Sequence, residues 1–369
     1  MTPRLLQPDA IALGHTLAVG AQVAVENDRI AGISFEEEAD AEQLAGTLLP
    51  GFVDLQVNGA GGHSVDEVQT EGLEQIAHTV AQNGAAAFLP TLITCPFPIL
   101  LEKVAAVATW IENRERQRGA LPLGIHVEGP FLVEAGAHDE SSLLDPTPEL
   151  VQQMIQAGAG HIKLVTLAPS RAGAPSAVAQ FRAAGITVAL GHGTGVAGIA
   201  DCVASGATMA THLFNAMGAG DHRDPGMAYT IMDHPELSCG LILDGVHVHD
   251  AMVRLAWARV GVERFVLVTD CVSAMGMPDG EYTLAGMPVT LEAGTVRNAD
   301  GVLAGSALNM FEAAGSFLRT IPDVSPWSLA RVAATNPADV ISAHGVGRIA
   351  PGHLARFILL GEDGSLRTV

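Results

Sequence analysis

Eight short apolar segments, each long enough for a buried strand, alternate with helical stretches along most of this 369-residue chain. Several of these segments are continuously apolar, which is typical of parallel strands covered on both faces. Alanine-rich stretches with helical periodicity lie between them, for example residues 71–84 and 97–117. Eight strand–helix units over about 250 residues predict a (β/α)8 barrel of the TIM type. The strands are predicted at residues 51–57, 85–93, 123–128, 161–168, 186–192, 207–212, 239–244 and 265–270.

The two ends of the chain have a different pattern. Residues 1–49 carry short alternating segments, in which Asn27-Asp28 predicts a hairpin turn. After residue 345, short apolar segments resume between glycine and proline residues. We therefore predict one small β domain built from residues 1–49 plus 345–369, with the barrel in residues 50–344.

The amino-acid composition limits the cellular compartments and the classes of binding partner that we expect. The formal net charge of −21 argues against nucleic acid, because its phosphates would be repelled. An anionic substrate would need a local arginine or histidine pocket. No stretch reaches the roughly 18 uninterrupted apolar residues of a membrane span, and the N-terminal segment lacks the features of a signal peptide. The cysteines form no disulfide pattern and indicate a reducing compartment, so we expect a cytoplasmic protein without a membrane partner. They are Cys95, Cys202, Cys239 and Cys271.

Titratable side chains stand at the ends of four predicted strands. Glu128, His192, His212 and Asp270 each close an apolar segment. In a (β/α)8 barrel the carboxyl ends of the strands carry the catalytic groups. Imidazole and carboxylate are ligands of zinc and similar ions, and a catalytic site keeps one position open for water. The four positions together predict a divalent metal hydrolase.

Asp270 has a different predicted role from the other three. A carboxylate beside an activated water can accept its proton and hand that proton to a leaving amine. The alternatives are that Asp270 is a further metal ligand or the N-cap of a helix.

Three loops carry residues suited to substrate binding. Arg223 lies in a loop rich in glycine and aspartate, where it could hold an anionic group such as phosphate or form a surface ion pair. His247 and His249 lie in the segment Asp244 to Asp250. The small residues of 301–310 could line a pocket or pack tightly.

Eight segments, in order across nearly the whole chain, carry a family resemblance. They are PGFVDLQVNGAGG, HVEGPFL, GAH, GHG, THLFNAM, DGVHV, VTD and LAGSAL. HVEGPF and THLFNAM are specific in combination. With these motifs the chain resembles the N-acetylglucosamine-6-phosphate deacetylase family of the amidohydrolase superfamily. The resemblance implies a (β/α)8 barrel beside a small β-sandwich, and hydrolysis of the acetamide of N-acetyl-D-glucosamine 6-phosphate to D-glucosamine 6-phosphate and acetate.

The resemblance also implies roles for individual residues. Glu128, His192 and His212 match the metal ligands, and Asp270 matches the catalytic acid/base. Arg223 matches a phosphate-binding arginine that in this family can reach a neighbouring subunit, which implies a homodimer or higher homo-oligomer. The substrate-binding positions are matched by Ala137, His138, Asn215, Ala216, Arg223, His247, Leu303, Ala304 and Gly305.

One departure from the superfamily pattern concerns the metal. Many members carry His-x-His at the end of the first barrel strand, whereas this chain has Gln56-Val57-Asn58. Amides are poor zinc ligands beside imidazole, so we predict one divalent ion per subunit. Zinc is the predicted ion, with iron, manganese and cobalt as alternatives, and Gln56 is predicted to contact it through water.

Other functions stay open at this level. The motifs do not distinguish the glucosamine from the galactosamine epimer of the phosphorylated sugar. A cyclic amidase related to dihydroorotase or hydantoinase is a second alternative, against which the absence of His-x-His argues. A catalytically silent barrel is the non-enzyme alternative, against which the retained site residues argue.

Overall fold

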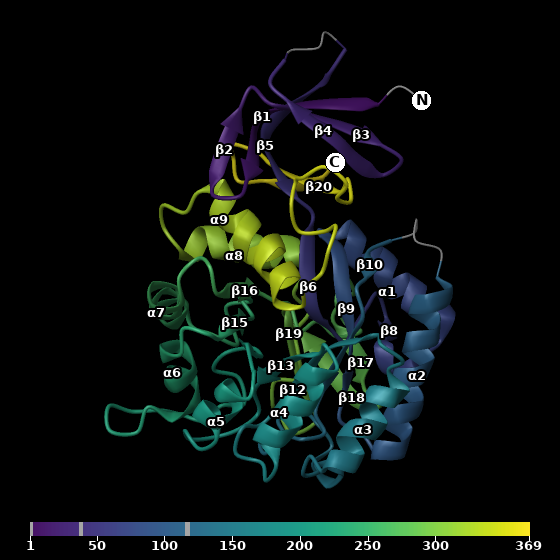
Figure 1. Cartoon of the computed structure of the whole chain (residues 1–369), viewed down its shortest axis with the longest axis vertical. Coiled ribbons are helices and arrows are strands. Elements are labelled where there is room, and N and C mark those ends of the chain that lie inside the picture. The colour runs from purple at the N-terminus through teal and green to yellow at the C-terminus, as the bar shows by residue number, and fades with distance from the viewer. Residues whose placement is uncertain (1–2, 37–39, 115–118) are drawn as a thin grey trace.

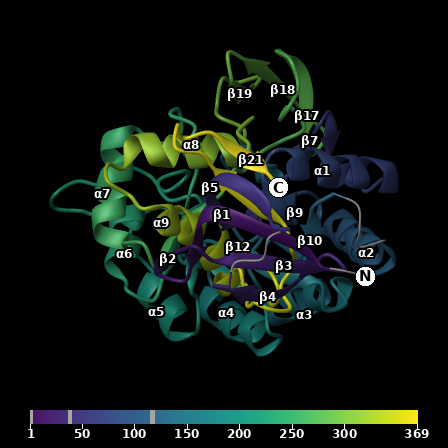
Figure 2. The same ribbon diagram turned by 90° about the horizontal axis from the view of Figure 1, so that it is seen from above.

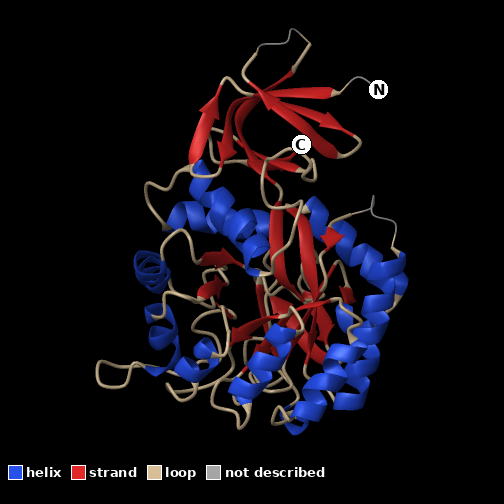
Figure 3. Cartoon of the chain, in the orientation of Figure 1, coloured by secondary structure: helices blue, strands red, loops and turns tan. Residues whose placement is uncertain are grey.

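A parallel barrel forms the body of the molecule (Figures 1 and 3). The computed structural model describes residues 3–36, 40–114 and 119–369. The barrel strands pair in the order β6-β9-β11-β12-β13-β14-β15-β16, each parallel to its neighbour. A parallel bridge from Val57 to Cys271 joins the first strand to the segment after the last. The strands are β6 (Phe52–Val57), β9 (Ala85–Ile93), β11 (Ile125–Glu128), β12 (Ile162–Leu167), β13 (Thr187–Leu190), β14 (Met209–Ala210), β15 (Ser238–Leu241) and β16 (Phe265–Leu267).

All eight predicted strands are present, so the predicted (β/α)8 barrel is confirmed. Their apolar residues divide between two cores. One cluster holds Val53 and Leu55 with Ala87 and Leu89 from the neighbouring strand, and a second cluster joins the strands to the surrounding helices. The predicted segments run too long at their carboxyl ends. The barrel strands β13, β14 and β16 stop two or three residues before the predicted site residues that follow them.

The helices surround the barrel (Figure 3). In α1, the buried residues Leu73, Ile76, Ala77 and Val80 recur at helical spacing and face the core. The predicted helix 97–117 is observed as α2, and residues 115–117 lie outside the described part of the chain. The α-helices are α1 (Thr70–Gln82), α2 (Phe97–Asn113), α3 (Pro148–Ala157), α4 (Ala174–Ala183), α5 (Ile199–Ala204), α6 (Gly226–Asp233), α7 (Asp250–Val260), α8 (Met310–Thr320), α9 (Pro326–Ala330) and α10 (Asn336–Val340). The other helical segments are the 3-10 helices η1 (Val65–Glu67) and η2 (Glu140–Ser142) and the π-helix η3 (Arg331–Thr335).

Both chain ends build one strand-rich unit at the amino-terminal side of the barrel (Figures 1 and 2). Its sheet order is β21-β20-β5-β1-β3-β4, with β2 paired to β1. The predicted turn at Asn27-Asp28 joins β3 to β4, and both residues have the positive φ that this turn requires. The boundaries 1–49 plus 345–369 stay a prediction. The strands are β1 (Arg4–Leu13), β2 (Thr16–Val19), β3 (Gln22–Glu26), β4 (Arg29–Ser34), β5 (Glu42–Pro50), β20 (Phe357–Leu360) and β21 (Leu366–Thr368).

A three-stranded antiparallel sheet interrupts the barrel after its last strand, and the sequence did not predict it. It stands at the rim of the barrel beside α1 (Figure 2). The three-stranded antiparallel sheet consists of β17 (Gly280–Leu284), β18 (Met287–Glu292) and β19 (Thr295–Asn298). The remaining short strands are β7 (Gly59–Ala60), β8 (His63–Ser64) and β10 (Leu121–Pro122).

No helix in the described ranges is long and apolar enough to cross a membrane.

Candidate active site

A cavity of about 270 Å³ lies where the carboxyl ends of the barrel strands meet. This volume is close to the lower end of the range of ligand pockets, about 300 Å³. Ten of the predicted site residues line it, from segments spread over most of the chain. The described lining residues are Asn58, Ile93, Glu128, Gly136, Ala137, His138, His192, His212, Asn215, Ala216, Asp270, Leu284, Val302, Leu303 and Gly305.

Backbone geometry turns the titratable residues toward one another. Glu128 is the last residue of β11, whereas His192 and His212 follow the ends of β13 and β14 by two residues. His192, His212 and Asp270 have φ of 51°, 25° and 53°, a region that costs a non-glycine residue about 1–2 kcal/mol. Left-handed residues of this kind cluster at functional sites, where the surrounding structure holds them.

Three basic atoms converge within this cavity. The Oε1 atom of Glu128 lies 2.9 Å from Nε2 of His212 and 3.2 Å from Nε2 of His192. The two Nε2 atoms are 3.1 Å apart. In a tetrahedral zinc site with bonds of about 2.0–2.2 Å, ligand atoms are separated by about 3.3–3.6 Å, slightly more than the separations here. The donor set and its spacing therefore fit a divalent cation.

The hydrogen-bond partners of Nδ1 give His192 and His138 different roles. Nδ1 of His192 is 2.8 Å from the carbonyl oxygen of Glu134, which can only accept, so Nε2 of neutral His192 keeps its lone pair for a metal. Nδ1 of His138 faces two groups of Thr94: the backbone N–H at 3.3 Å, which can only donate, and Oγ1 at 2.9 Å, which can donate or accept. Because the N–H can only donate, it favours an Nδ1 that accepts. Nε2 of His138 then carries the hydrogen. His138 has ligand atoms within 4.8 Å of those of Glu128 and His192, but this tautomer makes it a hydrogen-bond donor.

Burial and charge set the protonation states. Burial acts to raise the pKa of Glu128, but the contacts and charges of the His192 and His212 imidazoles outweigh it and hold that pKa well below its usual range. Burial, with the charge of His192, lowers the pKa of His138 to about 3, so His138 is neutral at pH 7. Burial, together with the negative charge of Glu128, raises the pKa of Asp270 to about 6. A carboxyl group with this pKa can both take and return a proton near neutral pH.

Asn58 is the site residue that the sequence analysis did not assign. It follows β6, lines the cavity, and donates a hydrogen bond from Nδ2 to Oδ1 of Asp270 at 2.7 Å. Its place in Gln56-Val57-Asn58, at the end of the first strand, was a usable signal. Leu284 was also missed, because it reaches the cavity from the inserted sheet, which carried no recognised pattern.

Four predicted site residues are not among the described lining residues. Gln56 is buried beside the site and donates from Nε2 to Oε2 of Glu128 at 3.1 Å. Ala304 is buried in the cluster under β17–β19. The side chain of His247 is 2% exposed, with Nδ1 2.6 Å from Oδ2 of Asp244. Arg223 is exposed in the loop between β14 and α6, which extends from the barrel at the lower left of Figure 1.

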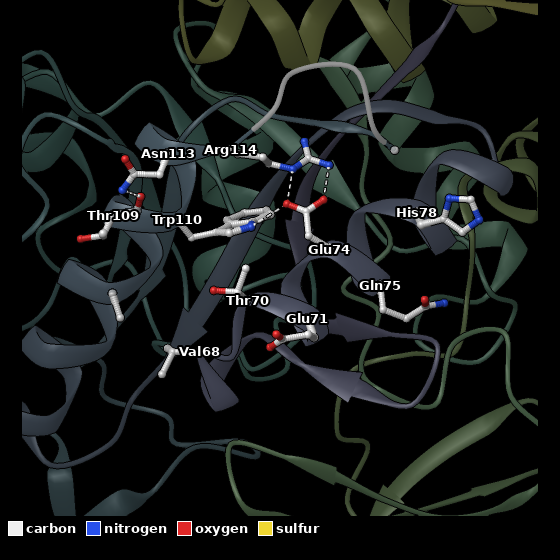
Figure 4. A pocket seen from close by; sticks show the side chains of 12 residues that line it. Val68, Thr70, Glu71, Glu74, Gln75, His78, Thr109, Trp110, Asn113 and Arg114 are labelled. Atoms are coloured by element: carbon white, nitrogen blue, oxygen red, sulfur yellow. Dashed lines mark hydrogen bonds and ion pairs between the residues drawn. The ribbon is translucent and has the colours of Figure 1, made fainter.

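A larger cavity lies on the outside of the barrel, between α1 and α2 (Figure 4). It measures about 1000 Å³, and no predicted site residue lines it. Glu74 at its wall accepts from Nε1 of Trp110 at 2.9 Å and from Nε of Arg114 at 2.8 Å. These three side chains of the wall therefore pair with one another. We place the candidate active site in the smaller cavity, because four buried titratable residues, Glu128, His192, His212 and Asp270, converge there.

Comparisons with known proteins show similarity over most of the chain. A model of the amidohydrolase family matches residues 47–369. The N-acetylglucosamine-6-phosphate deacetylase of Caenorhabditis elegans is 33% identical over 93% of this chain and 87% of that protein. The N-acetylgalactosamine-6-phosphate deacetylase of Shewanella sp. is 34% identical over 90% of this chain and 84% of that protein.

A solved structure is similar over nearly the whole chain. It is an aspartate-to-alanine variant of N-acetyl-D-glucosamine-6-phosphate deacetylase from Mycobacterium smegmatis, in complex with N-acetyl-D-glucosamine-6-phosphate. The TM-score is 0.91 at 30% identity, with 99% of this chain and 97% of that chain covered.

Proposed function

Since this chain belongs to the amidohydrolase family, we propose that it is a metal-dependent deacetylase of N-acetyl-D-glucosamine 6-phosphate. The products are D-glucosamine 6-phosphate and acetate, as in amino-sugar catabolism and cell-wall recycling. The observation that carries the proposal is the convergence of Glu128, His192, His212 and Asp270 in one cavity. The structural likeness to a complex with this substrate supports the glucosamine epimer.

Glu128, His192 and His212 would hold one divalent cation per subunit, and we propose zinc. When bound, such an ion lowers the pKa of a water from about 16 toward about 7 and polarises the carbonyl oxygen of the acetyl group. Gln56 lies next to these three metal-binding residues, and its side-chain amide donates a hydrogen bond to Oε2 of Glu128, the carboxylate oxygen that does not face the two imidazoles. This bond orients the carboxylate toward the two imidazoles.

Asp270 and His138 act on the reacting atoms. The carboxylate of Asp270 takes a proton from the attacking water as the C–O bond forms. It then gives that proton to the nitrogen as the C–N bond breaks, so Asp270 ends as it began. His138 stays neutral and donates from Nε2 to the acetyl carbonyl oxygen. A fixed donor at this position stabilises the negative charge that develops on that oxygen.

Binding of the sugar phosphate is assigned to residues farther from the scissile amide. We propose that Arg223 holds the phosphate in a bidentate contact, from the extended loop of a second copy in a homodimer. His247 is placed at the sugar or its phosphate, and Ala137, Asn215, Ala216, Leu303 and Gly305 line the remainder of the cavity. Remote contacts of this kind position the acetyl group for attack. We place the enzyme in the cytoplasm, where its phosphorylated substrate would be found.

One experiment tests these assignments together. Acetate release is measured from N-acetylglucosamine 6-phosphate, from its galactosamine epimer and from the unphosphorylated sugar, with metal content determined on the same sample. We expect fast release from the first substrate alone and about one metal ion per chain. Faster release from the galactosamine epimer transfers the assignment to that substrate, for which relatives of 34% and 32% identity are named. No release from any of the three, despite bound metal, contradicts the sugar-phosphate assignment.

A further inference from the structure

The two carboxylate oxygens of Asp270 have different surroundings. Oδ1 accepts the hydrogen bond from Nδ2 of Asn58 at 2.7 Å. Oδ2 has no partner in the described part of the chain and is open to the cavity that Asp270 lines. The two oxygens of Asp270 are therefore not equivalent as acceptors of a proton.

The orientation of the Asn58 amide follows from its chemistry. A carboxylate can only accept, so the NH2 group of Asn58 must face Asp270. The opposite end, Oδ1 of Asn58, is buried without a partner among the described residues. Leaving a buried carbonyl unpaired costs free energy, so the bond to Asp270 has to be strong enough to hold the amide in this orientation.

The backbone holds Asn58 rigidly at the closure of the barrel. Its N–H donates to the carbonyl oxygen of Cys271 at 2.8 Å, and its own carbonyl accepts from the N–H of Val65 at 2.8 Å. Cys271 follows Asp270 directly, so the same backbone pairing fixes both ends of the Asn58–Asp270 contact. The side chains of Asn58 and Asp270 thus meet in one arrangement although they are far apart in sequence.

We propose that Asn58 is a positioning residue that reserves Oδ2 of Asp270 for proton transfer. A proton on Oδ1 would set an O–H beside the N–H of Asn58 and weaken the hydrogen bond, because a hydroxyl oxygen accepts less well than a carboxylate oxygen. Oδ2 therefore takes the proton from the attacking water and returns it to the departing nitrogen, while Oδ1 stays bonded. This inference rests on the proposed function, because it needs Asp270 to act as the acid/base.

The test compares Asn58→Leu with Asn336→Leu. Asn336 is a matched control, because it is a buried amide outside the site whose Nδ2 donates to two carbonyl oxygens and whose Oδ1 is also unpartnered. We expect Asn58→Leu to lower kcat for acetate release by about 10- to 100-fold, as for other supporting residues, with KM within about 3-fold and metal content unchanged. The control loses stability and keeps its kcat.

Asn58→Asp, which preserves shape, is the second variant and keeps the inference testable if the leucine variant does not fold. A second carboxyl group beside Asp270 disfavours its ionisation, so the acidic limb of the pH–rate profile moves to higher pH. The inference is overturned if the limb stays in place, if kcat of Asn58→Leu stays within about 2-fold of the wild type, or if the loss appears only in KM or metal content.

A readout without turnover separates this inference from the proposed function. If the wild type releases no acetate from any of the three sugars, the proposed function fails. The Asn58 contact is then tested by carbon-13 NMR titration of the Asp270 carboxyl group. We expect Asn58→Leu to raise the pKa of Asp270, because the donor that stabilises the carboxylate is gone. An unchanged titration curve overturns the contact itself.

Discussion

Two of the described cavities rank in one order by volume and in the opposite order by their chemistry. The cavity between α1 and α2 is about 1000 Å³, is lined mostly by helix residues, and has Glu74 paired with Arg114 in its wall. The cavity at the strand ends is about 270 Å³ and brings together buried groups with shifted pKa values and left-handed backbone. The comparison shows that buried titratable groups with shifted pKa values, gathered in one cavity, locate a functional site better than the volume of the cavity does.

The largest expected effect comes from removing one of the three converging donors. His212→Ala should lower both metal content and acetate release by more than about 100-fold, beyond the loss typical of supporting residues. The control is His249→Ala, an exposed histidine on the same side of the barrel that caps α7. Metal analysis and turnover on the same samples decide the outcome. Full metal content in His212→Ala would remove this residue from the ligand set.

Asp270→Asn should separate catalysis from metal binding. The amide cannot carry the proton, so kcat should fall by about 10²- to 10⁴-fold, the usual contribution of general acid–base catalysis. Metal content and KM should change little, because no described contact joins Asp270 to the three donors by a hydrogen bond. Steady-state kinetics with metal analysis checks this. Near-normal turnover would show that another group moves the proton.

The pH dependence follows from the raised pKa of Asp270. The base must be ionised to take a proton, so kcat/KM should fall tenfold per pH unit below the pKa of Asp270, which is about 6. A bound cation offsets the charge of Glu128, so the midpoint should lie at or below that value. The pH–rate profile measures it. A profile that is flat down to pH 4 would contradict the assignment of Asp270 as the base.

Asp244→Asn should have a smaller effect, confined to substrate binding. Asp244 accepts from Nδ1 of His247, whereas an asparagine amide would donate to it and move the hydrogen of a neutral His247 to Nε2. Oδ1 can still accept from the backbone of Val246 and His247, so the loop is kept. We expect KM to rise by about 10-fold. Nitrogen-15 NMR reads the tautomer, and Asp244→Asn should add nothing in a His247→Gln background.

The smallest effect is expected at the outer cavity. Glu74→Ala removes the acceptor of Trp110 and Arg114 and should lower the free energy of unfolding by about 1–3 kcal/mol. We expect kcat/KM to stay within about 2-fold of the wild type. Denaturant unfolding and acetate release measure the two quantities. A large loss of activity without a loss of stability would make the larger cavity a functional site and break the comparison.

Local sequence patterns predicted the barrel and the four titratable residues at its strand ends, whereas the family resemblance supplied the other expected site positions. The strands of residues 52–57 and 85–93 could be read because buried parallel strands are continuously apolar. The same reading extended β13 and β14 through His192 and His212, although the chain leaves the strand before each histidine. Composition does not show this, because the left-handed φ at these residues is imposed by tertiary contacts.

The sequence by itself determined the barrel, the strand-rich unit formed by both chain ends, and the identity of the residues at the strand ends. Only the tertiary structure decided what those residues do to one another. It paired Asn58 with Asp270 at the closure of the barrel, and it gave His138 and His192 opposite hydrogen-bond roles through Thr94 and Glu134. The physical reason is that apolar periodicity is a local property, whereas a hydrogen-bond partner is selected by atoms that only folding brings together.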